Sequence, residues 1–218
     1  MFNLRSTMLV AGAVFASFSG FVVAETTDQM EEEVITVIGT RTERSLNEVA
    51  TSVSVISAVD IEEGLYRDIA DLVKYEPGVS VAGSGSRLGL SGFIIRGIGG
   101  NRVQTLVDGV RFPDEFSFGP FLSSRRDFVD LDSLETVELS KGSGSSLYGS
   151  DALGGVVSFT TKGPSRYVSA DEPFYAGIKY GYSGVDNSSN GTVTLAGGND
   201  RISGLVCYTY RDAKETET

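Results

Sequence analysis

Residues 134–161, LETVELSKGSGSSLYGSDALGGVVSFTT, form the stretch of sequence that decides the fold. Its two ends, residues 134–139 and 156–161, are short runs rich in apolar and β-branched residues, and such runs predict strands. Residues 141–155 between them are rich in glycine and serine and are too polar for a core. This pattern predicts two strands of a small sheet, separated by a long polar loop.

The residues before this stretch predict the rest of a compact α+β domain that spans residues 41–164. Residues 51–57 alternate in the manner of a strand, and Ser57 or Asp60 is suited to cap a short helix that follows. A second helical pattern runs over residues 67–75 and stops at a proline and a glycine. We therefore expect a small mixed sheet with short helices and long loops.

Large loops and one tight turn complete the prediction for this domain. Residues 82–92 form a loop rich in glycine and serine, and residues 112–126 form a long aromatic loop. Asp108-Gly109 separates two strand-like runs, and this dipeptide is a strong signal for a two-residue hairpin turn. Because turn geometry is a sufficient reason for both residues, we assign them no catalytic role.

Composition excludes several functions. The 218-residue chain has no histidine, so histidine-dependent nucleophilic catalysis and histidine-containing zinc sites are excluded. Its single cysteine, Cys207, cannot form an internal disulfide or a multi-cysteine metal cluster. A net charge of −11 argues against non-specific nucleic-acid binding, which needs clustered Lys and Arg. GxSxG and GxxxxGK[ST] motifs are absent, so we expect no enzyme activity, no metal site and no resident cofactor.

Residues 1–24 have the pattern of a secretory signal peptide. Arg5 is the only charged residue, an apolar run covers residues 8–23, and small residues precede Glu25. A membrane anchor is the alternative, but serines and a glycine interrupt the run, which is shorter than a membrane span. We expect export and cleavage after Ala24.

Residues 25–40 are acidic at first and then contain a short strand-forming run, and we expect this segment to be mobile. The run is Glu33, Val34, Ile35, Thr36, Val37 and Ile38. A solvated run of this kind is suited to add a strand to the sheet edge of another protein. The alternative is an ordinary first strand of the following domain.

The last part of the chain, residues 165–218, predicts about three antiparallel strands. Residues 174–182 alternate between an apolar face that ends in tyrosine and a more polar face, and residues 192–197 and 202–210 repeat the alternation. Segments of about ten residues with this pattern are typical of outer-membrane barrel strands. A soluble antiparallel sheet is the alternative.

The connections between these strands favour the barrel. Residues 183–190 read as a long polar loop, whereas Asn199-Asp200 reads as a tight turn. Barrels of the outer membrane alternate long outer loops with short periplasmic turns. We therefore expect the first strand to run outward from the periplasm.

Several short strings, in this order, resemble TonB-dependent outer-membrane receptors. The strings are EVITV and GTR in residues 33–41, PGV at 77–79, IRG at 95–97, NRV at 101–103, LVDG at 106–109, KG at 141–142, LYG at 147–149 and ALGGV at 152–156. The run over residues 101–159 is most similar to the haem and haemoglobin receptor branch. The resemblance covers nearly all of the chain after residue 24.

This resemblance implies a gated transporter in the cell outer membrane. Residues 41–164 would be the plug domain, and residues 165–218 the first antiparallel strands of the transmembrane barrel in contact with lipid. Residues 33–38 would be the TonB box, whose partner is the C-terminal domain of TonB, bound by strand addition. A plugged barrel has about 22 strands, whereas three strands alone would leave unpaired edges in the lipid. We therefore expect the 218-residue chain alone to be soluble or to aggregate.

The resemblance also implies a plug latch formed by Arg96 and Lys141 with glutamates of the barrel. Lys141 replaces the commoner arginine. An ammonium group retains the charge but cannot make the planar two-point contact of a guanidinium. The alternative for both residues is an ordinary cation at a sheet edge or in a loop.

Haem, free or on a carrier protein, is the transported ligand that the resemblance implies. Candidate ligand-facing residues are Arg87, Phe112, Asp114, Glu115, Phe116 and Phe118. The aromatic members of this set have an alternative role in packing against the barrel wall. Because the chain has no histidine, axial ligation of haem by the plug would need another residue, or the ligand would lie in the rest of the barrel. A ferric-siderophore or cobalamin receptor is the alternative function, and a soluble periplasmic binding module is a more distant one.

Overall fold

The computed structural model describes residues 52–83, 90–114, 117–118, 122–123, 129–184, 187–199 and 201–212. All of these residues belong to one compact unit. Within this described part, no helix is long and apolar enough to cross a membrane.

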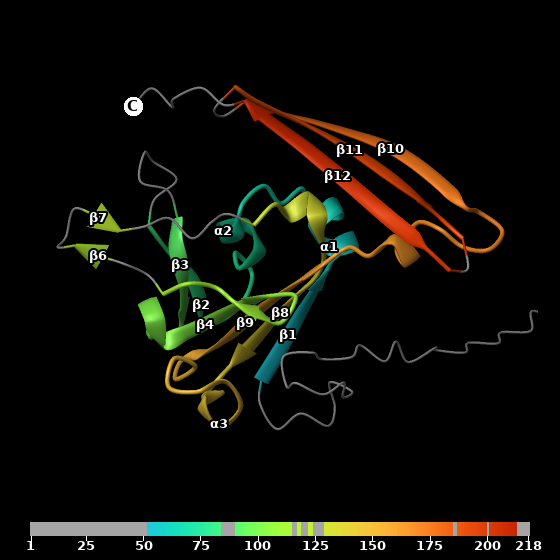
Figure 1. Cartoon of the computed structure of the whole chain (residues 1–218). Helices are drawn as coiled ribbons and strands as arrows, with labels where there is room; N and C mark the ends of the chain where they lie inside the picture. The colour runs from blue at the N-terminus through green and yellow to red at the C-terminus, as the bar shows by residue number, and fades with distance from the viewer. Residues whose placement is uncertain are drawn as a thin grey trace, which may run out of the picture. The chain divides into compact units, whose positions relative to one another are not determined.

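A five-stranded mixed sheet forms the first domain (Figure 1). Its order is β1 (Ser52–Ser57), β8 (Leu134–Lys141), β9 (Gly155–Thr161), β4 (Val103–Val107) and β5 (Val110–Arg111). The pair β4 and β9 is parallel, and the other pairs are antiparallel. The central antiparallel pair β8 and β9 confirms the strands predicted at the two ends of residues 134–161.

Short helices flank this sheet. In α1 (Ala58–Glu63), the Ser57 hydroxyl accepts from the Asp60 N–H at 3.2 Å, and the Asp60 carboxylate accepts from the Ser57 N–H at 2.8 Å. This reciprocal cap confirms the predicted helix start. The structure shortens the second predicted helix to α2 (Ile69–Leu72), because Asp68 caps its N-terminus and Val73 already departs from helical geometry. A four-residue helix, α3 (Ser145–Tyr148), lies unpredicted in the polar loop.

The core lies where the central strands meet the helices and β3 (Leu90–Ile95). The largest fully buried side chains are Phe159, Ile95, Leu134, Leu139, Val137, Val156 and Val157. Burial of each such side chain contributes about 1.5–3 kcal/mol. Six of these seven residues lie in residues 134–139 and 156–159, which explains why that stretch determines the fold.

Smaller hairpins carry the loops of this domain. β2 (Val79–Gly83) pairs with β3, so the predicted 82–92 loop is shorter at both ends than expected. The predicted aromatic loop over residues 112–126 contains a minimal hairpin, β6 (Ser117–Phe118) with β7 (Leu122–Ser123). Three short 3-10 turns, η3 (Gly100–Arg102), η5 (Leu131–Ser133) and η6 (Pro164–Arg166), complete the described elements.

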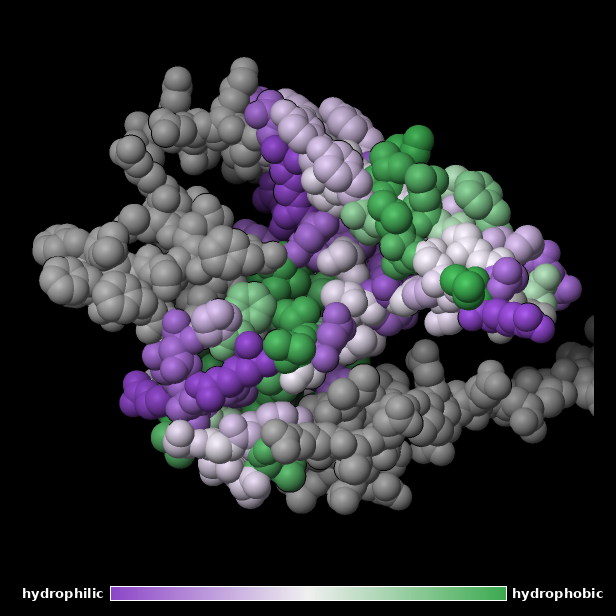
Figure 2. Space-filling model, in the orientation of Figure 1, coloured by the Kyte–Doolittle hydropathy of each residue, from purple (hydrophilic) through white to green (hydrophobic). Residues whose placement is uncertain are grey.

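Three long antiparallel strands follow: β10 (Phe174–Ser183), β11 (Ser188–Gly198) and β12 (Ser203–Asp212). One face is apolar and exposed, with Ile178 85%, Tyr180 73% and Val206 63% exposed. Figure 2 shows hydrophobic side chains gathered over these strands. The predicted alternation is therefore confirmed.

The connections between these strands differ from the prediction. β11 begins at Ser188, so only residues 184–187 join it to β10, and residues 199–202 join it to β12. The predicted contrast between a long loop and a tight turn is wrong. The polar character of residues 188–190 favours a loop, but these residues extend the strand as partners of residues 181–183.

Candidate functional site

Arg96, one of the two predicted latch residues, lies in a tight turn at the end of β3. The Ile98 N–H donates to the Ile95 carbonyl at 2.9 Å, and the Ile95 N–H donates to the Ile98 carbonyl at 2.8 Å. Arg96 has a φ of 50° and Gly97 a φ of 83°. A non-glycine residue in this region costs about 1–2 kcal/mol, so the turn holds Arg96 in an exposed position at some cost.

Lys141, the second predicted latch residue, is the last residue of β8. Its ammonium group donates to Glu76 Oε2 at 3.0 Å. The Lys141 side chain is only 9% exposed and that of Glu76 is 21% exposed. A cation so deeply buried needs a partner, and here the partner belongs to the plug.

Both predicted latch residues adjoin the same turn, residues 76–79. The Arg96 N–H donates to the Gly78 carbonyl at 2.7 Å, and Lys141 holds the Glu76 carboxylate. Gly78 has a φ of 76°, a conformation that favours glycine. The structure thus brings Arg96 and Lys141 to one turn, while the contact of either with a barrel glutamate stays a prediction.

Two predicted ligand-facing residues, Phe112 and Asp114, follow β5. The Arg111 guanidinium donates to Asp114 Oδ1 at 2.7 Å and also pairs with Asp151. The hydrogen bond to Asp114 is the main cause that raises the pKa of Arg111 above its ordinary value. Phe112 is half-buried, and its N–H donates to the Thr105 carbonyl at 2.9 Å. Asp114 is therefore engaged by the plug itself.

A small hollow of about 10 Å³ lies beside these charges. Gln104, Arg111, Asp114 and Asp151 are among the residues that line it. Gln104 is 4% exposed, its Nε2 donates to the Thr105 carbonyl at 3.1 Å, and its buried Oε1 has no hydrogen-bond partner among the described residues. The hollow has room for about one water molecule, which makes it too small for a ligand.

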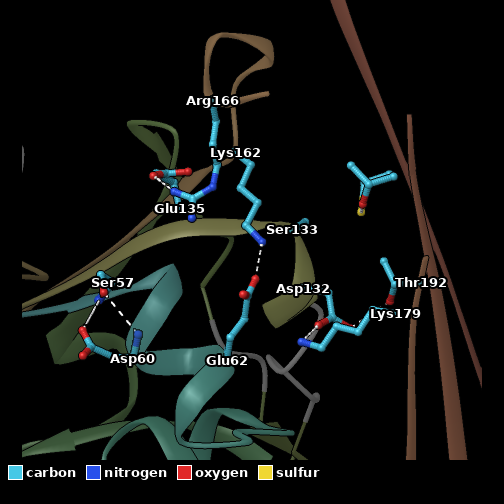
Figure 3. Close-up of polar contacts among 12 residues, drawn as sticks. Ser57, Asp60, Glu62, Asp132, Ser133, Glu135, Lys162, Arg166, Lys179 and Thr192 are labelled. Carbon is cyan, nitrogen blue, oxygen red and sulfur yellow. Dashed lines mark hydrogen bonds and ion pairs between the residues drawn. The ribbon is translucent and has the colours of Figure 1, made fainter. Parts of the chain in front are cut away.

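Asp132 in η5 forms a buried polar contact between the first domain and the long strands (Figure 3). Lys179 Nζ donates to its Oδ1 at 2.7 Å, and the Thr192 hydroxyl donates to its Oδ2 at 2.9 Å. Arg211 lies 3.6 Å from Asp132 Oδ2 and also pairs with Asp130. Asp132 is 8% exposed, so its carboxylate depends on these partners.

The partners of Asp132 determine its charge state. Burial acts to raise the pKa of this carboxyl, but hydrogen bonds from Lys179 and Thr192, together with the charges of Lys179 and Arg211, outweigh it. The pKa of Asp132 is therefore below its ordinary value of 3.8. The contact is ionic at neutral pH.

Several predicted site residues lie outside the described part of the chain. These are Glu33, Val34, Ile35, Thr36, Val37, Ile38, Arg87, Glu115 and Phe116, and the side chain of Phe118. Among the described residues, no group of three or more acidic or cysteine side chains is placed to hold a metal ion.

Sequence reasoning missed Glu76, Arg111, Asp132 and Asp151. No local signal marks Glu76 or Asp132, because each finds its partner at least 47 residues away along the chain. Arg111 and Asp114 are three residues apart, and this spacing of opposite charges was a usable signal.

Comparison with known proteins places this fold. The family model for the TonB-dependent receptor plug domain matches residues 45–156. The chain belongs to the TonB-dependent receptor plug family. Members of this family are TonB-dependent receptors.

Curated relatives of this plug protein share about a third of its residues. Hemoglobin-haptoglobin utilization protein B of Neisseria meningitidis serogroup A is 35% identical over 221 aligned positions, which cover 96% of this chain and 26% of that protein. Hemoglobin and hemoglobin-haptoglobin-binding protein B of Haemophilus influenzae is 34% identical, covering 87% of this chain and 18% of that protein. The chain thus spans about a quarter or less of these relatives.

Solved structures with the same fold include two receptor complexes. The Serratia marcescens hemophore receptor HasR, with its hemophore HasA and heme, aligns at a TM-score of 0.66 and 24% identity, covering 74% of this chain and 24% of that one. The FpvAI–pyocin S2 complex aligns at 0.64 and 19%, covering 82% of this chain and 22% of that one. At these identities the likeness concerns the fold alone.

Proposed function

We propose that this chain belongs to a receptor that imports haem iron across the outer membrane with energy from TonB. The observation that supports this most is the 35% identity, over 96% of the chain, to a protein named for the use of hemoglobin-haptoglobin. A second relative, from Haemophilus influenzae, is also named for binding hemoglobin and hemoglobin-haptoglobin. Haem, free or released from a carrier protein, is the common cargo.

The domain boundaries follow from this proposal. Residues 1–24 act as a signal peptide, residues 25–40 carry the TonB box, residues 41–164 form the plug, and residues 165–218 begin the barrel. The exposed apolar face of β10, β11 and β12 supports the last assignment, because barrel strands turn such a face to lipid. The opposite face, with Lys179 and Thr192, then turns to the plug.

Haem would have to be held without histidine from this chain. Residues near the small hollow, Phe112 and Asp114, stay our candidates for the ligand-facing side, together with Arg87, Glu115, Phe116 and Phe118. Arg111 holds Asp114 at 2.7 Å, so this carboxylate is positioned rather than free. Axial ligation would come from a residue of this chain other than histidine or from another part of the receptor.

The substrate is tested by growth of an iron-starved host that lacks its own haem receptors and carries the complete reading frame. Haem, haemoglobin, a ferric siderophore and cobalamin are supplied separately to matched cultures, with cobalamin tested in a cobalamin-requiring host. We expect growth on haem and haemoglobin only. Growth restricted to the siderophore or to cobalamin would reject the haem assignment and retain the receptor family.

Coupling to TonB is tested by a substitution within the box. Ile35→Pro removes a backbone N–H that strand addition requires, and we expect it to abolish growth on haem. Ile35→Val keeps both the donor and the β propensity, and is expected to grow as the parent does. Equal growth of the two variants would contradict the assignment of residues 33–38.

A further inference from the structure

Two acids of one short turn attach the last three strands to the plug. Asp130 precedes η5 and Asp132 lies within it, and their cation partners are Lys179 on β10 and Arg211 on β12. The predicted latch has the opposite charge sense, because there the plug contributes cations. Barrel acids that attract Arg96 or Lys141 would be repelled by Asp130 and Asp132. A barrel surface that suits one of the two attachments is therefore unfavourable at the other.

We propose that Asp132 is a docking anchor that determines which face, and which row of side chains, of β10, β11 and β12 lies against the plug. The proposal rests on the assignment of these strands to the barrel and does not depend on the ligand or on TonB.

The row that Asp132 recognises runs straight across the three strands. Lys179 is the register partner of Thr192, and Thr192 is the register partner of Thr209. The Asp132 carboxylate takes a hydrogen bond from each of the first two residues, and the Thr192 and Thr209 hydroxyls lie 3.0 Å apart. The Asp132 carboxylate is therefore connected to all three strands through contiguous hydrogen bonds.

A slip of one residue would destroy this match. The adjacent row consists of Ile178, Val193 and Tyr208, which belong to the opposite, apolar face. Asp132 would then face two aliphatic side chains while remaining buried, and an unpaired buried carboxylate is strongly unfavourable. The penalty selects the observed face and register.

Burial distinguishes the anchor from its neighbour. The Asp130–Arg211 pair is 33% and 42% exposed, and exposed ion pairs of this kind contribute little. Asp132 is 8% exposed and accepts one charge-assisted hydrogen bond and one from a hydroxyl. Of the two acids, Asp132 is therefore expected to contribute more to docking than Asp130.

The chain contains a native reporter for this docking. Cys207 on β12 and Ser133 of the plug line one hollow of about 190 Å³, in which Lys162 and Thr194 also take part. Ser133→Cys, with the native Cys207, supplies two thiols that a short bifunctional thiol reagent can join. Asp132 is intact in this parent protein, so the yield of cross-link reports docking.

The test uses the 218-residue chain refolded in detergent micelles. We expect Asp132→Asn to reduce the cross-link yield roughly tenfold, as loss of a charge-assisted hydrogen bond implies. The matched control Asp171→Asn removes an exposed acid and is expected to leave the yield unchanged. Lys179→Met removes the same hydrogen bond without altering the plug. Its cross-link yield therefore tests the anchor even if Asp132→Asn disturbs the plug.

Register is tested by moving the thiol by one residue. In Cys207→Ser with Tyr208→Cys, the thiol lies on the opposite face, and we expect almost no link to Ser133→Cys. Undiminished linking in both Asp132→Asn and Lys179→Met, or equal linking from position 208, would overturn the proposal. Because the assay needs neither haem nor TonB, its failure is distinct from failure of the proposed transport function.

Discussion

Asp108 serves the β4–β5 hairpin and the end of β9 together. Asp108 and Gly109 have φ values of 48° and 77°, as a type I′ turn requires, which confirms the turn assignment. The Asp108 carboxylate also accepts from the N–H and the hydroxyl of Thr161, each at 2.8 Å. Turn chemistry predicts the first role, whereas the second depends on a contact 53 residues away.

Substitution of Asp108 separates these two roles. Asp108→Ala should lower the free energy of unfolding by about 2 kcal/mol, because alanine is strained at positive φ and both acceptors are lost. Asp108→Asn tolerates positive φ and keeps one acceptor, so about 1 kcal/mol or less is expected. Urea unfolding of the chain measures both, with exposed Asp171→Ala as a neutral control. Equal losses for alanine and asparagine would contradict this account.

The buried pair of Lys141 and Glu76 joins the end of β8 to the turn before β2. Lys141→Met should lower the free energy of unfolding by about 3 kcal/mol, since it leaves Glu76 without its partner. The double variant Lys141→Met with Glu76→Met should recover most of this loss. Urea unfolding of the 218-residue chain provides the measurement. A Lys141 whose only role is to latch onto the barrel would instead leave the stability of this chain unchanged.

Attachment of η5 to the strands should depend on pH with a defined sign. The folded-state pKa of Asp132 is lowered, so its stabilising contribution is present above the unfolded pKa and is lost as pH falls through the folded value. The facing charged groups are Asp130, Lys179 and Arg211. A carboxyl ¹³C NMR titration should place the pKa of Asp132 below 3.8, and Lys179→Met should raise it. An unchanged titration in Lys179→Met would contradict the assigned cause.

The sequence predicts an element well when the interactions that form it lie within a few residues of one another along the chain. β8, β9 and the Ser57 cap follow from patterns within a few residues. α3 was missed because Ser145–Tyr148 is a single turn between glycines with no side-chain cap. The extent of β11 was missed because polar residues continue its pairing with β10. The Asp132 contacts, which join residues 47 and 60 apart, require the folded arrangement.

In the complete receptor, the exposed face of β10–β12 has a measurable consequence. Ile178, Val193 and Tyr208 form one cross-strand row on this face. Ile178→Arg should destabilise the membrane-inserted protein by about 2–4 kcal/mol if this row lies near the bilayer midplane. The heat-modifiable band in outer-membrane fractions should weaken, whereas Ile178→Ala, which adds no charge, should largely retain it. Equal bands for the two variants would place this face away from lipid.

TonB-driven haem import is tested most directly by the accumulation of iron-labelled haem in cells that carry the complete receptor. Three forms are compared: the parent, a deletion of residues 33–38, and a matched deletion of residues 27–32. We expect accumulation in the parent and the matched deletion, and none beyond surface binding when residues 33–38 are missing. Undiminished accumulation without residues 33–38, or no accumulation in the parent, would contradict the proposed function.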